Sequence, residues 1–247
     1  MPTIAMKSQT LWITTTHFDG YMHKNNADWA TVRDATSAAL LAQTQNLSST
    51  AIASYASRGQ NYLYRTFMIF DASSITSNVK SATLKIYGYS KNSADFFVVR
   101  GTQGATHTTA DWDAIAGWDG SSSDGSGGGD NEGNVTKYSA EIDASEDWST
   151  SGYNEITLLQ PALDRLKADD DFGIVLINST YDLRDIENDT GSTLKTGMYF
   201  SEYSGTSRDP VIDYELGYGN DIMGVDSSDI SEVNAVATAN ISKVIGV

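Results

Sequence analysis

The chain has 247 residues, no cysteine, and 32 acidic against 16 basic residues, which gives a net charge of −16. The absence of cysteine excludes thiol catalysis, cysteine-ligated zinc and iron–sulfur chemistry. The negative charge argues against nucleic-acid and anionic-membrane partners, because their phosphates would repel the chain. We therefore expect a solvated acidic surface around a body large enough to bury a core without disulfides or metals.

The N-terminal part of the chain has a mixed pattern. Residues 11–16 predict a first strand, residues 17–26 a polar loop, and residues 29–32 and 50–55 two short strands. Between the two short strands, the alanine-rich stretch 35–45 favours a helical turn.

The stretch from 62 to 89 is the centre of the predicted fold. Residues 62–70 place bulky side chains on both parities, which is typical of a strand covered on both faces. After a short turn that begins at Asp71, residues 79–89 alternate apolar and polar side chains, as in a strand with one buried face. Together the two strands predict the spine of an antiparallel β domain.

The remaining body is predicted to be strands with one helix. Strands are expected at 95–100, 138–143, 154–159, 172–177, 197–202 and 210–216, and a proline near its start predicts a short helix at 160–167. Residues 119–133 are mostly Gly, Ser and Asp and predict an exposed, mobile loop. The expected fold is all-β, a jelly-roll-like antiparallel β sandwich over residues 1–216 with a C-terminal extension over 217–247.

Several motifs in the chain resemble those of a known domain family. Phe67-x-x-Phe70-Asp71, a Ser-Ser-Ile corner, and Val79-Lys-Ser-Ala-Thr-Leu-Lys-Ile-Tyr resemble the signature of DNRLRE-type β-sandwich domains, which are akin to carbohydrate-binding modules. The similarity continues in the pair Trp112 and Trp118 and in the closing strands, although the arginine of the family's last motif is missing at Ser201-Glu202-Tyr203. The resemblance implies a fold more strongly than a function.

The last thirty residues differ from the body. Two nonapeptides of the same pattern, 228–236 and 239–247, place apolar residues at every third position, which fits neither a strand nor a sustained helix. Such a segment cannot bury itself alone, so we expect it to dock on another chain. It resembles the endings of structural proteins of tailed phages. The residues expected to bind a neighbour are Ile222, Val225, Ile230, Val233, Val236, Ile241, Val244 and Val247.

Two further kinds of site are considered. Trp112 and Trp118 stand beside Asp or Gly, so they predict either structural plugs at the end of the sandwich or a platform for a surface glycan. Asp119, Asp124 and Asp130 are weak candidates for Ca²⁺, because their spacing does not match an EF-hand. The three histidines and the carboxylates form no recognisable catalytic motif, and no cofactor is predicted.

The function predicted from these patterns is structural. The N-terminus lacks the pattern of a signal peptide, and no apolar run approaches the about 18 residues of a membrane span, so a sandwich of extracellular type suggests a virion, released by lysis. We expect a non-enzymatic protein of a tailed bacteriophage that decorates or cements the capsid. Its expected partners are other virion proteins and its own copies, as a homo-oligomer such as a trimer. The alternative is a carbohydrate-binding or receptor-binding module of a phage tail, a fibre or a cell surface.

Overall fold

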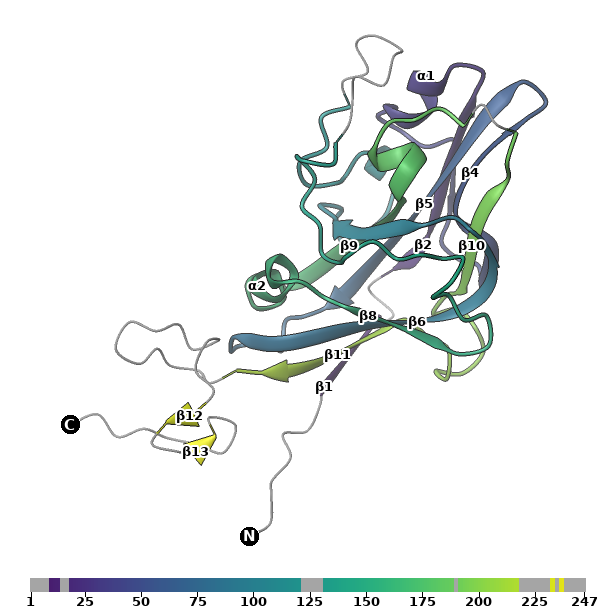
Figure 1. The fold of residues 1–247 in the computed structure, drawn as a ribbon. Helices are drawn as coiled ribbons and strands as arrows, with labels where there is room; N and C mark the ends of the chain where they lie inside the picture. Colours follow the sequence, from purple (N-terminus) through teal and green to yellow (C-terminus); the bar gives the residue numbers. More distant parts are fainter. Residues whose placement is uncertain are drawn as a thin grey trace.

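The computed structural model describes residues 9–13, 18–120, 131–188 and 191–217, together with the backbone of two short C-terminal strands. Figure 1 shows the arrangement. The strands of the body are β1 (Gln9–Trp12), β2 (Asp19–Asn26), β3 (Leu40–Ala42), β4 (Leu47–Ser57), β5 (Gln60–Asp71), β6 (Val79–Asn92), β7 (Phe96–Arg100), β8 (Tyr153–Thr157), β9 (Asp171–Asn178), β10 (Leu194–Tyr199) and β11 (Val211–Leu216). The helices are α1 (Trp29–Arg33) and α2 (Gln160–Ala168), and the short strands are β12 (Glu232–Val233) and β13 (Val236–Ala237).

The body is all-β and antiparallel, as predicted, and its eleven strands form one continuous sheet that folds into two layers. One layer runs β1–β11–β6–β8. The other contains β7, β9, β5, β2 and β3. Strands β4 and β10 connect the layers, because β10 pairs with β4 on one side and with the far end of β6 on the other. The arrangement is that of a β sandwich.

Strand β5 lies at the centre, and from Arg65 to Phe70 both of its faces are covered, as the sequence predicted. Met68 and Phe70 point into the core between the layers, where they meet side chains of β6, β7 and β9. Leu63 and Phe67 point the other way, into a second core that α1 and the loops around Trp112 and Leu183 cover. Both cores are apolar, and burial of their side chains supplies the main driving force for folding.

Three predictions in the N-terminal part were wrong. Residues 17–26 are not a loop: β2 lies there, and it forms because it pairs along its whole length with β5. The predicted strand at 29–32 is helix α1, whose N-cap Asp28 accepts a hydrogen bond of 2.8 Å from the Thr31 N–H. The stretch 35–45 contains strand β3 rather than a helical turn. In each case tertiary pairing or a capping residue overrides the weak local pattern.

The first and last strands of the body, β1 and β11, are neighbours. Strand β1 pairs antiparallel with β11, so that Gln9 faces Tyr214 and the start of one strand lies beside the end of the other. The β4–β5 hairpin lies at the opposite end of the body (Figure 1). The molecule therefore has one end where the chain enters and leaves, and a second end formed by hairpins.

Candidate functional site

Trp112 and Trp118 are brought together around a buried arginine. The guanidinium of Arg65 on β5 lies 4.2 Å from the ring centre of Trp112 and 4.3 Å from that of Trp118. It donates to both carboxylate oxygens of Asp182, at 2.8 and 2.6 Å, and to the Trp112 carbonyl at 2.6 Å. Because a planar guanidinium stacks on aromatic rings and donates at its edge, one side chain satisfies both kinds of contact.

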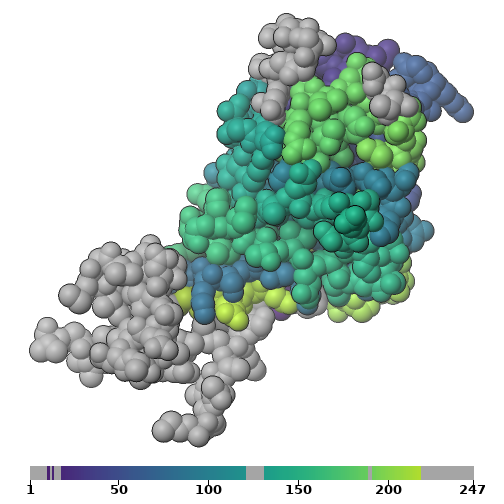
Figure 2. All heavy atoms as spheres, in the orientation of Figure 1, coloured from purple at the N-terminus to yellow at the C-terminus, as the bar shows by residue number. Residues whose placement is uncertain are grey.

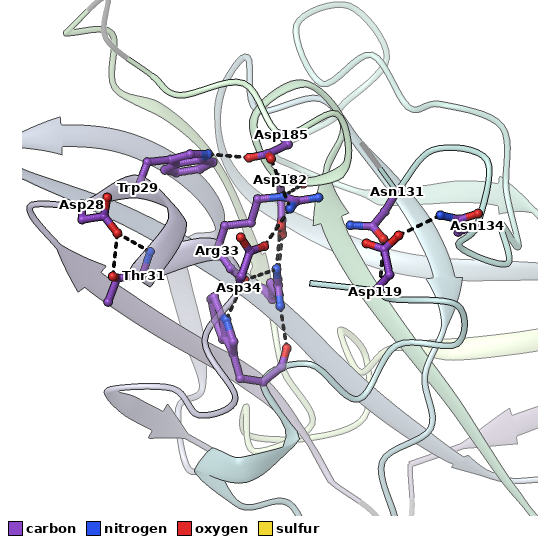
Figure 3. A network of polar contacts seen from close by, with 12 residues as sticks. Asp28, Trp29, Thr31, Arg33, Asp34, Asp119, Asn131, Asn134, Asp182 and Asp185 are labelled. Atoms are coloured by element: carbon purple, nitrogen blue, oxygen red, sulfur yellow. Dashed lines mark hydrogen bonds and ion pairs between the residues drawn. The ribbon is translucent and has the colours of Figure 1, made fainter. Parts of the chain in front are cut away.

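A second arginine extends this network (Figure 3). Arg33, from α1, donates to the Asp182 carbonyl at 2.6 Å and to the Asp34 carboxylate at 2.7 Å, and it lies 3.5 Å from the Asp185 carboxylate. Asp185 also accepts a hydrogen bond of 2.8 Å from the Trp29 indole. Arg33, Arg65 and Asp182 are completely buried. The network therefore joins α1, β5 and the π-helical turn Ser179–Leu183 inside the protein.

The exposure of Trp112 and Trp118 decides whether they can form the predicted glycan platform. The side chain of Trp112 is 0% exposed, and its indole N–H donates to the Arg33 carbonyl at 3.2 Å. The ring of Trp118 is half-buried and lies over both arginines. A sugar ring stacks only on an exposed aromatic face, so the positions of these two residues favour the structural interpretation.

The calcium candidates are only partly described. The Asp119 N–H donates to the Asn131 side chain at 3.0 Å, and its carboxylate accepts from Asn134 at 3.0 Å, which closes the base of the loop (Figure 3). Asp124 and Asp130 lie outside the described residues. In the part of the chain that is described, no three His, Asp or Glu side chains gather closely enough to hold a metal ion.

Three carboxyl groups with raised pKa values lie near the start of β2 and the loop after β10. Burial raises the pKa of Asp19 to about 7, against hydrogen bonds from Ser201, and the charge of Glu202 raises it further. Burial also raises the pKa of Glu202 and, to about 6, that of Asp209. The Asp19 carboxylate accepts from the Ser201 N–H at 2.9 Å and from its hydroxyl at 2.6 Å. Because Asp19 is 0% exposed, this group fastens β2 to the loop and has no access to a substrate.

One aromatic array is a row of partly exposed tyrosines that crosses β4, β5 and β2, which we call the tyrosine ladder (Tyr21, Tyr55, Tyr62 and Tyr64). Tyr55 and Tyr62 stack with ring centres 4.8 Å apart and planes 8° apart. The Tyr64 ring lies 6.0 Å from that of Tyr55 and 5.8 Å from that of Tyr21. All four side chains are partly exposed, so their edges are available to a partner.

Polar and charged groups border the tyrosine ladder. The ammonium of Lys195 on β10 lies 5.0 Å from the Tyr55 ring centre, and the imidazole of His23 lies 5.0 Å from the Tyr64 ring centre. Gln60 accepts hydrogen bonds from Asn25 at 2.7 Å and from the Tyr62 hydroxyl at 3.4 Å. Burial, together with the hydrogen bond between the Tyr64 and Tyr55 hydroxyls, raises the pKa of Tyr64 above its ordinary value, and its hydroxyl is protonated at neutral pH.

Sequence reasoning missed the tyrosine ladder. Tyr62 and Tyr64 share the parity of Met68 and Phe70, so they appeared to belong to the core. The structure places them on the same face of β5 but further along the strand, toward the hairpin end. Aromatic residues on neighbouring strands often pair. Recognising these pairs requires the register of β4 and β2 against β5, which the sequence does not provide.

Most of the predicted docking residues lie outside the described residues: Ile222, Val225, Ile230, Ile241, Val244 and Val247. Val233 and Val236 belong to β12 and β13 and are direct partners in that small antiparallel pair.

Comparisons with protein families and with curated proteins give no relative. No protein-family model matches the chain, and no curated protein matches it significantly. None of the described helices is long and apolar enough to cross a membrane.

Proposed function

We propose that this chain is a non-enzymatic structural protein of a tailed-phage particle, with the β body displayed on the capsid as a decoration or cement. The observation that carries the proposal is the pairing of β1 with β11, which places the exit from the body at Leu216 beside the entry at Gln9. An extension that leaves at this point can grip a neighbouring subunit while the body and its hairpin end project away.

The apolar pattern of residues 217–247 supports this function. Its isoleucines and valines recur at every third position, and a segment of this length gains little from packing on itself alone. A specific contact buries about 800 Å² per partner, and repetition over many copies strengthens weak individual contacts. Because each copy carries a charge of −16, the attraction between copies must come from apolar contacts.

The test is incorporation into particles. A phage that lacks the gene is supplied with the full chain or with a chain ending at residue 216, and the protein in purified particles is quantified by mass spectrometry. We expect the shortened chain to fold, by circular dichroism, and to be absent from particles. Its incorporation at the normal level would refute the proposal.

A matched pair of variants separates apolar docking from charge. Ile241→Asp with Val244→Asp should abolish incorporation, whereas Asn240→Asp with Ser242→Asp adds the same charge at neighbouring polar positions and should leave it nearly unchanged. Equal effects of both pairs would indicate that charge, rather than apolar contact, controls docking.

The tyrosine ladder supports a second function, attachment to a surface glycan. Partly exposed tyrosines bordered by Lys195, His23 and Gln60 combine ring surface with hydrogen-bonding groups, which is the composition of many sugar sites. Tyr55 and Tyr62 of the ladder pair with each other close to the β4–β5 turn, and this hairpin lies away from the exit of the chain (Figure 1). This site replaces Trp112 and Trp118 as the candidate to be tested.

A glycan array followed by calorimetry tests this second function. Tyr62→Ala should weaken binding at least about tenfold, since loss of one good contact of about 1.4 kcal/mol has that effect. Tyr89→Ala is the control, because Tyr89 is 41% exposed and lies on β6, outside the ladder. An array without hits, or equal losses in the two variants, would exclude the ladder as a glycan site.

A further inference from the structure

Strand β8 is an edge strand: no described strand pairs with its outer side, and just past its end the Leu159 N–H donates to the Tyr138 carbonyl at 2.8 Å. It pairs with β6 so that Asn154 faces Ile86 and Ile156 faces Leu84. The Leu158 N–H donates to the Ala82 carbonyl at 2.9 Å, and the Gly88 N–H donates to the Gly152 carbonyl at 3.1 Å. Since hydrogen-bonded pairs alternate in an antiparallel ladder, the backbone groups of Glu155 and Thr157 point away from β6. No described strand pairs with them there.

A groove runs along this free edge. It has a volume of about 300 Å³, and its other wall is the segment 139–142. That segment is tied to β7, because Phe96 and Ile142 exchange backbone hydrogen bonds of 3.2 and 2.9 Å. The groove therefore lies where the edges of the two layers separate, with Ile142, Trp148 and Ile156 as its apolar lining. The stretch that contains it, coloured teal to green, lies in the middle of the face shown in Figure 2.

The lining of the groove is acidic. It contains Glu141, Asp147 and Glu155 and no basic residue. Glu141 pairs with Arg184 at 3.2 Å and Glu155 with Lys85 at 3.3 Å, whereas Asp147 forms no ion pair with the described residues. A free strand edge, an apolar floor, the carboxylate of Asp147 and two further carboxylates that each have one cationic partner together define the chemistry of an occupant.

We propose that this groove, the β8 groove, binds an extended basic segment of another protein, which adds to β8 as an extra strand. The backbone of such a segment bonds to Glu155 and Thr157, alternate side chains enter the groove, and lysine or arginine side chains meet the acidic rim. The inference does not depend on the particle assignment, because it rests on the edge and the groove alone.

Charge argues against the C-terminal extension of a second copy as the occupant. The extension 217–247 contains four acidic residues and one lysine: Asp221, Asp226, Asp229, Glu232 and Lys243. The whole chain has a net charge of −16. Like charges along an edge are a common protection against pairing between identical copies, so the same rim that repels a second copy attracts a basic partner.

The probe is a capped heptapeptide of alternating lysine and valine, with a fluorescent label for anisotropy, added to the full-length protein. Its control is the same peptide with alternate amides N-methylated, which keeps the charge but removes the backbone donors on one side. We expect the control to bind at least about tenfold more weakly, because two or more hydrogen bonds are lost. Equal binding of both peptides would show attraction to net charge alone and would overturn the proposal, as would failure of the unmodified peptide to bind.

A variant locates the site. Thr157→Pro removes the N–H that points into the groove, and proline is tolerated on an edge strand where its N–H side faces outward. Thr157→Val keeps the N–H and is the matched control. Proline should weaken the peptide about tenfold or more and valine should not. Amide chemical shifts give a readout without substitutions: changes at Glu155 and Thr157 support the proposal, and changes confined to other residues refute it.

Discussion

Arg65 joins several elements of the fold beside the second core. It is 0% exposed, and its donors reach Asp182, Trp112 and Arg33 while two indoles cover its faces. A buried ion pair of this kind adds little stability over an apolar replacement of the whole pair, but loss of one partner leaves an uncompensated charge. The arginine therefore specifies how α1, β5 and the Ser179–Leu183 turn meet.

Replacement of Arg65 tests this role. Arg65→Met should lower the free energy of unfolding by about 3–5 kcal/mol, because Asp182 stays buried without its cation. Arg184→Met is the comparison, since Arg184 makes ion pairs with Glu132 and Glu141 but is partly exposed, and about 0–1 kcal/mol is expected. Urea unfolding of both variants measures the difference. Similar losses would mean that the buried network has no special role.

Asp19 makes a prediction about pH. Its pKa of about 7 in the folded chain lies above the ordinary 3.8, so the folded state binds a proton that the unfolded state lacks between these values. The contribution of Asp19 to the free energy of unfolding therefore falls as the pH rises from about 4 to about 7. His107 acts in the opposite sense, because burial lowers its pKa from 6.5 to about 4 and its contribution is lost on acidification.

The variant Asp19→Asn isolates the carboxyl group. Its free energy of unfolding should increase relative to that of the natural chain as the pH rises from 5 to 8. Urea titration at several pH values measures this difference. Asp143→Asn is a control whose change in stability is expected to have the opposite sign. Hydrogen bonds from Ser145 and the Glu146 N–H lower the pKa of Asp143, so this variant should lose stability at neutral pH. A constant difference between Asp19→Asn and the natural chain would show that Asp19 is not protonated in this range.

At the scale of elements, strand β6 shows which features of a strand the sequence predicts and which it does not. Its alternation predicted the buried positions Ala82, Leu84 and Ile86. The same pattern does not reveal that β6 leaves one layer near Gly88 and continues beside β10 in the other. Strand β2 was missed because its polar sequence is stabilised by pairing with β5, and the tyrosine ladder was missed for the same reason. Periodicity predicts which face is buried, whereas strand neighbours and register depend on contacts distant in sequence.

Gly88 is required where β6 changes partners. A Cβ atom at this position would lie 1.9 Å from the Ser149 carbonyl oxygen and 2.8 Å from the Trp148 indole nitrogen. Gly88→Ala should therefore cost about 1–3 kcal/mol of unfolding free energy through overpacking. Gly104→Ala is the matched control, because nothing lies within 4 Å of its added Cβ. Thermal unfolding of the two variants compares them, and an unchanged midpoint for Gly88→Ala would contradict the close approach.

At the scale of the whole molecule, charge and apolar contact make opposite predictions about salt. Copies with a charge of −16 repel one another, and this repulsion is screened beyond about 10 Å in 0.1 M salt. Contacts between copies through the apolar extension should therefore strengthen as salt is added. Binding of a basic segment in the β8 groove should weaken, because its attraction to the acidic rim is screened in the same way.

Light scattering of the natural chain at 0.02 and 0.5 M NaCl tests the first half of this contrast. We expect the average mass to rise with salt, and the rise to disappear in Ile241→Asp with Val244→Asp but to persist in Asn240→Asp with Ser242→Asp. Peptide anisotropy under the same two conditions tests the second half and should show weaker binding at high salt. An average mass that falls with salt would mean that ion pairs hold the copies together and would contradict the proposed apolar contacts through the extension.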